Sequence, residues 1–89
     1  MQIPKLRVLV EAGVVREAAA SYQAELSGWV VSITYASRHG ERCEVLERQR
    51  GGTRVFATLD AVARGLAGLG LPVFRVDASS LAGAGEEPL

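Results

Sequence analysis

The sequence has few of the residues that most often carry chemistry or form cross-links. It contains one cysteine, Cys43, and one histidine, His39. A single cysteine excludes an internal disulfide and is typical of a protein in a reducing compartment, so we expect a cytoplasmic location. Because zinc prefers four ligands, His39 and Cys43 alone do not complete a metal site. We therefore expect no metal, His39 in an exposed turn and Cys43 as a small buried side chain.

Long apolar runs are also missing, and aromatic residues are few. Glu11 and Arg16 interrupt the apolar residues near the start of the sequence, which predicts no signal peptide and no membrane partner. With two Phe, two Tyr and one Trp, Val, Leu, Ile and Ala must build most of the core. The 89 residues suffice for one small domain with a modest core.

No arrangement of side chains indicates an enzyme or a cofactor site. Gly51-Gly52 lacks the Lys and Ser or Thr of a phosphate-binding loop, and no helix is expected directly after it. The acidic residues of the segment 38–48 alternate with arginines, which is typical of a solvated face of mixed charge rather than an acid–base pair. We therefore expect a non-enzymatic protein without a cofactor.

The first part of the chain combines a short helix with an ambiguous segment. Residues 4–12 fit a helix because Pro4 suits its first turn and Gly13 its end; a strand at 6–10 is the alternative. Residues 14–26 fit either a helix or a strand. We favour the strand, since a turn at Ser27-Gly28 would pair it with the segment that follows.

Together with the elements expected in the rest of the chain, these segments predict one α+β domain spanning residues 1–77. Residues 29–36 are the strongest strand, and a third strand is expected at about 41–49. A helix at 58–69 and a strand at Val73–Val76 follow. The expected order is α-β-β-β-α-β, a small antiparallel sheet of three to four strands with one or two helices on one face. Residues 78–89 lack apolar periodicity and are expected to be a disordered tail.

Alternation and helical spacing predict how the core forms. One face of the strongest strand carries Trp29, Val31, Ile33 and Tyr35. The helix at 58–69 begins at Thr58, a good N-cap, and has an apolar stripe that should pack against that sheet face. The stripe consists of Leu59, Val62, Ala63, Leu66 and Leu69.

The sharpest functional feature is a basic segment, residues 48–54, with three arginines and no acidic residue. Strand alternation would place Arg48 and Arg50 on one face, and arginines at the other end of the strand could extend a positive sheet surface. Arginine in such a setting can contact phosphates and base edges. The alternative is a polar hairpin whose arginines are offset by neighbouring glutamates. The sequence thus predicts nucleic-acid contacts at Arg38, Arg42, Arg48, Arg50 and Arg54. The formal net charge of the chain is +0, so it lacks the basic excess that is usual in nucleic-acid-binding proteins.

Two stretches carry a family resemblance. One is Ile3-Pro4-Lys5-Leu6 through Glu11-Ala12-Gly13-Val14. The other runs from Arg54-Val55-Phe56-Ala57-Thr58-Leu59-Asp60-Ala61 through Leu69-Gly70-Leu71 to Phe74-Arg75-Val76-Asp77. They cover about half of the chain and resemble short proteins of proteobacterial plasmids and integrative conjugative elements, some labelled partition-associated. The resemblance implies an accessory role on a mobile genetic element and supplies no activity.

Two functional hypotheses follow. The first is DNA binding through the arginine-rich strand or hairpin. The second is a protein-interaction or dimerisation module that uses the strand Val73–Val76 or the surface near Gly65 and Gly68. Pairing at a sheet edge would also stabilise a domain with a small core.

Overall fold

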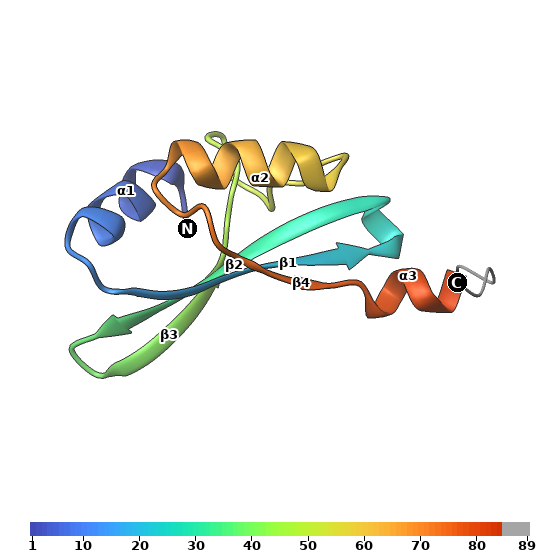
Figure 1. The fold of residues 1–89 in the computed structure, drawn as a ribbon. Helices are drawn as coiled ribbons and strands as arrows, with labels where there is room; N and C mark the ends of the chain where they lie inside the picture. The colour runs from blue at the N-terminus through green and yellow to red at the C-terminus, as the bar shows by residue number, and fades with distance from the viewer. Residues whose placement is uncertain (85–89) are drawn as a thin grey trace.

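Two helices cover one face of a four-stranded sheet (Figure 1). The structure is a computed structural model that describes residues 1–84, with side chains through Leu81. It confirms the α+β class and the expected order, and it adds a short helix after the last strand. The elements are α1 (Ile3–Glu11), β1 (Val15–Gln23), the 3-10 turn η1 (Ala24–Leu26), β2 (Gly28–Ser37), β3 (Gly40–Val45), α2 (Leu59–Gly68), β4 (Arg75–Asp77) and α3 (Ser79–Ala84).

The strand order is β3-β2-β1-β4, and the sheet is mixed. β1 pairs antiparallel with β2, and β2 pairs antiparallel with β3. β4 pairs parallel with β1, which differs from the all-antiparallel sheet expected from the sequence. The reason is that α2 runs back over the sheet, so β4 starts at the same end as β1 (Figure 1).

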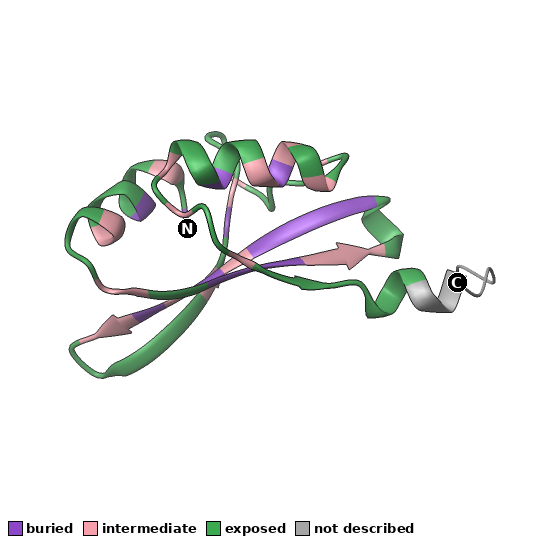
Figure 2. Cartoon of the chain, in the orientation of Figure 1, coloured by how far each residue is buried: buried purple, intermediate pink, exposed green. Residues whose placement is uncertain are grey.

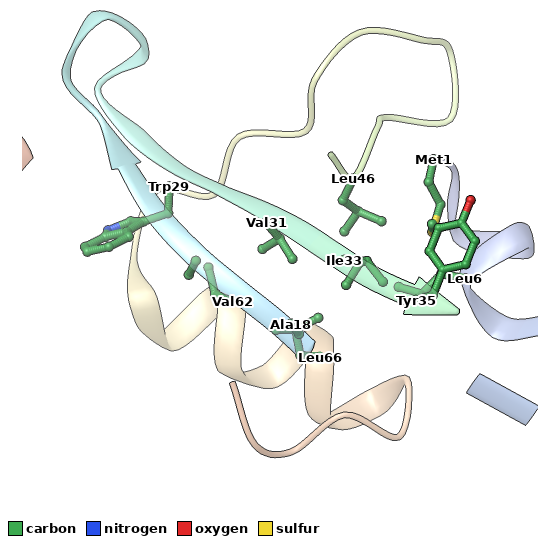
Figure 3. Packing of buried hydrophobic residues seen from close by; sticks show 11 residues of the cluster. Met1, Leu6, Ala18, Trp29, Val31, Ile33, Tyr35, Leu46, Val62 and Leu66 are labelled. Carbon is green, nitrogen blue, oxygen red and sulfur yellow. The ribbon is translucent and has the colours of Figure 1, made fainter. Parts of the chain in front are cut away.

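The core lies between this sheet and the helices, and Figure 2 shows its buried residues along β1 and β2. In the register of the sheet, Ala18 lies opposite Ile33 and Ala20 lies opposite Val31. The face predicted for β2 is confirmed. The fully buried side chains that pack with it from the rest of the chain (Figure 3) are Leu6, Leu46, Val62 and Leu66.

The helices begin and end as their sequences predict. The Thr58 hydroxyl accepts a hydrogen bond from the Ala61 N–H at 3.1 Å and caps α2. Pro4 lies in the first turn of α1, which ends before Gly13, where φ is +72°. The helix expected at 4–12 is confirmed as α1, and the strand expected within 14–26 is confirmed as β1.

Four details differ from the sequence predictions. Instead of a two-residue turn, η1 and Ser27, with φ +52°, connect β1 to β2. β3 ends at Val45, and β4 begins at Arg75. Cys43 is exposed rather than buried, because it lies beside Thr34 on the sheet face that α1 and α2 do not cover.

The segment expected to be a tail contains α3, which contacts β1. The rest of that segment, 85–89, lies outside the described residues. None of the helices described within residues 1–84 is long and apolar enough to cross a membrane.

Candidate functional site

The structure separates the arginines that the sequence grouped into one surface. Arg38 lies in the β2–β3 turn and Arg42 lies on β3. Arg48, Arg50 and Arg54 lie in the connection 46–58, which leaves β3 at its other end and rises toward α2 (Figure 1). The prediction that Arg48 and Arg50 share a strand face is wrong, because β3 ends before them. All five side chains are exposed.

A tight turn sets the course of this connection. The Arg48 N–H donates to the Gly52 carbonyl at 2.8 Å, and the Gly51 N–H donates back to the Arg48 carbonyl at 2.9 Å. Gly51 and Gly52 have φ of +91° and +81°, which glycine adopts without strain. The Arg48 Nε donates to the Gly51 carbonyl at 3.3 Å, so this guanidinium is partly used within its own turn.

Both ends of the segment 46–56 are fixed to β2. The Leu46 N–H donates to the Val31 carbonyl at 2.8 Å. Trp29 and Phe56 exchange two backbone hydrogen bonds, each of 2.8 Å. The Arg54 N–H donates to the Leu46 carbonyl at 3.0 Å and draws the two sides of the segment together. These hydrogen bonds therefore fix the backbone at Arg54.

Beside that backbone lies a groove of about 330 Å³, which we call the basic groove. It is bounded by α1, α2 and the segment 46–56. Arg7, Arg54 and Arg64, one from each of these three elements, line it. Most of its remaining lining is apolar: Ile3, Leu46, Phe56, Leu66 and Leu69, with Gly65 and Gly68 of α2.

Among the described residues that line the basic groove there is no Asp or Glu, so its charge is uncompensated there. The ion pairs found in the part of the chain that the structure describes use Lys5, Arg75 and the Met1 amino group, and none uses a groove arginine. The Arg54 guanidinium lies 5.2 Å from the centre of the Phe56 ring, a cation–π distance. The three arginines thus keep donors for an anionic ligand.

A second hollow of about 430 Å³ adjoins the basic groove and shares Ile3 and Arg54 with it. Its other lining residues are Gln2, Pro4 and Gln49. The Gln2 side-chain amide donates to the Gln49 carbonyl at 3.2 Å. The groove is therefore continued at this end by amide groups, which can donate to or accept from a ligand backbone.

A separate polar cluster links α1 to β3. The Lys5 ammonium lies 2.9 Å from Glu44 Oε2, and the Tyr35 hydroxyl donates to the same carboxylate. The Tyr35 hydrogen bond, and next the one from Lys5, holds the pKa of Glu44 below its usual value. The hydrogen bond to Glu44 raises the pKa of Lys5. Because Glu44 is fully engaged within the fold, we assign this cluster a structural role.

Sequence reasoning found part of the site. It identified Arg54 and the surface near Gly65 and Gly68, but not Arg7 or Arg64. Each of those two is the only arginine of its helix, and Glu11 and Asp60 lie four positions away on their helices, so the sequence shows no basic cluster there. Comparison with protein-family models, with curated proteins and with solved structures finds no match for this chain.

Proposed function

We propose that this is a non-enzymatic binding protein whose basic groove takes an acidic, partly apolar segment of a partner protein. One observation carries the proposal: arginines from three separate elements surround an apolar hollow, and no carboxylate is found among its described lining residues. Carboxylates form short charge-assisted hydrogen bonds with guanidinium groups, and a large apolar side chain gains free energy on an apolar floor. The basic groove offers guanidinium groups to a carboxylate and an apolar floor to a large side chain.

The arrangement also suits tight recognition by few residues. Arginine is enriched among the residues that dominate protein–protein binding energies. Arg54 stands on a segment held at both ends by β2, so its backbone loses little freedom when a ligand binds. Gly65 leaves α2 without a side chain where a Cβ would lie 3.6 Å from the Phe56 ring, which keeps the groove open on that side.

A short fluorescein-labelled peptide with glutamate and leucine at helical spacing tests the proposal by fluorescence anisotropy. The variant R7Q/R54Q/R64Q should lose at least about tenfold in affinity, since each charged hydrogen bond contributes about 1.5–3 kcal/mol. The matched control R16Q/R38Q/R42Q makes the same charge change outside the groove and should bind like the wild type. Equal losses in the two variants would refute a groove-specific site.

A second variant separates the shape of the groove from its charge. Gly65→Leu adds an apolar side chain next to Phe56 and leaves all arginines in place. We expect it to weaken peptide binding as much as the arginine variant does. Peptides with glutamine for glutamate, or alanine for leucine, should each bind more weakly than the parent peptide. If Gly65→Leu and the alanine peptide change nothing, then the apolar floor takes no part in binding.

DNA binding is the second candidate, and the placement of the turn 48–52 favours it. Arg48 and Arg50 lie in the same connection as Arg54, so they could extend the basic groove into a longer basic surface. R48A/R50A/R54A should weaken DNA binding uniformly across sequences and reduce the salt dependence by about 0.9 log unit per lost phosphate contact. R38A/R42A, at the other end of β3, tests the remaining predicted contacts. Absence of a mobility shift at ~50 mM salt would refute the DNA hypothesis.

We also propose the accessory role on a mobile genetic element that the family resemblance implies. It predicts that deleting the gene from a plasmid that carries it increases plasmid loss during growth without selection. Complementation with R7Q/R54Q/R64Q, compared with the wild type, would then show whether the basic groove is needed. Unchanged plasmid retention after deletion would contradict the proposal.

A further inference from the structure

β4 forms an open edge of the sheet. Among the described residues it has a strand partner only on its β1 side. It is three residues long and exposed throughout. Val76 on it is 44% exposed, and Val73 just before it is 84% exposed. Large apolar side chains beside an unpaired strand edge are the features that favour pairing with another strand.

The sequence of β4 is complementary to itself in charge. Arg75 and Asp77 pair with Ala19 and Ser21, so both project from the sheet face that α1 and α2 leave open. If two copies of β4 pair antiparallel around Val76, each Arg75 lies opposite the Asp77 of the other copy. Directly opposed side chains on an antiparallel pair interact, and opposite charges stabilise such pairs. Val76 then meets its own copy on the helix-covered face.

We propose that a second copy of this chain pairs antiparallel with β4, with the two-fold axis at Val76. The pairing joins the two sheets into one of eight strands. Because the axis is perpendicular to the sheet, α1 and α2 of both copies lie on the same face. Arg75 can keep its contact with Glu17 at 3.3 Å, since its guanidinium has further donors for Asp77 of the other copy.

The other edge, β3, fits self-pairing less well. An antiparallel pair around Cys43 would place Glu41 opposite Val45 of the other copy, a carboxylate against an apolar side chain. It would place Glu44 opposite Arg42 of the other copy, but the Glu44 carboxylate already binds Lys5 and Tyr35 within its own chain. The β4 register has no such mismatch, since Arg75 and Asp77 meet charges of opposite sign. The two edges are therefore distinguishable by experiment.

Disulfide trapping tests the register. In the full-length chain with Cys43→Ser, Val76→Cys supplies a single thiol that lies near its own copy only if β4 pairs around that residue. Mild oxidation should give a covalent dimer. Val73→Cys is the matched control: it is more exposed, yet the proposed register keeps the two copies of residue 73 about 20 Å apart. Equal trapping of both variants, or none of Val76→Cys, would overturn the proposal.

Charge reversal tests the Arg75–Asp77 pairs in the same background. Arg75→Asp or Asp77→Arg alone places like charges opposite each other and should reduce trapping at residue 76 by about fivefold or more. The double variant R75D/D77R restores the opposite pairs and should recover trapping, although it does not restore the contacts of these residues within one copy. Failure of this recovery overturns the register. Trapping of the wild-type chain through Cys43 would move the interface to β3.

Discussion

Gly28 offers a quantitative test of how the segment 46–56 is held. It is buried, and a Cβ at this position would stand 2.8 Å from the Phe56 carbonyl oxygen and still closer to the Val55 side chain. Phe56 cannot retreat freely, because its carbonyl accepts the Trp29 N–H. Overpacking costs about 1–3 kcal/mol, and replacing Gly by Ala returns about 0.4–1 kcal/mol through the unfolded state. These ranges leave a net loss of about 0–2.6 kcal/mol. Because the contact is with a fixed backbone oxygen, we expect Gly28→Ala to lower the free energy of unfolding by about 1–2 kcal/mol.

Urea denaturation followed by Trp29 fluorescence and far-UV circular dichroism measures this change. Val55→Ala removes the side-chain contact but not the contact with the carbonyl, and alone it should change stability by less than about 0.5 kcal/mol because Val55 is partly exposed. The double variant should therefore recover only part of the loss. Wild-type stability in Gly28→Ala would show that the segment 46–56 moves aside without cost. It would contradict the conclusion that hydrogen bonds to β2 fix the backbone at Arg54.

Three further predictions concern the core, the acid range and the C-terminal segment. Leu66→Ala should cost about 2–5 kcal/mol in urea unfolding because Leu66 is fully buried; a loss below about 0.5 kcal/mol would place it outside the core. The stabilisation from the lowered pKa of Glu44 is complete above the usual glutamate value of 4.5 and is lost as the pH falls through the lowered pKa. Glu44→Gln should thus flatten the decline in thermal midpoint on acidification, and an unchanged slope would argue against this role. Truncation after Ala78 should shift the midpoint by less than about 4 °C, and a larger drop would mean that α3 stabilises the fold.

The sequence predicts elements well where local signals agree. Thr58 as a cap, the apolar stripe of α2 and the glycine that follows it all indicate the same helix. The strand over residues 14–26 was ambiguous by itself, because short alanine-rich segments fit helical and strand spacing equally. Its outcome depended on β2, which offers Ala18 and Ala20 a row of large partners across the sheet. The strand pattern of β2 is unambiguous in the sequence, and pairing with β2 makes β1 a strand.

Features that depend on distant contacts were not predictable in the same way. The parallel placement of β4 follows from the direction of α2 over the sheet, which local sequence does not encode. Cys43 was expected to be buried because free cysteine usually is, but β3 presents it on the uncovered face. Arg7 and Arg64 join Arg54 only after both helices have docked, so a search for adjacent arginines selected the turn residues Arg48 and Arg50 instead.

The parallel pairing of β4 with β1 has a consequence for folding. The paired residues Ala19 and Arg75 lie far apart in the chain, whereas β1, β2 and β3 follow one another through short connections. Closing such a long loop costs entropy before any contact compensates for it, so β4 should join the sheet after the other three strands. The same strand should leave first during partial unfolding, which predicts that its amide hydrogens exchange faster than those of β2. A departing β4 exposes the β1 edge to the β4 of another molecule, a route to strand exchange between copies.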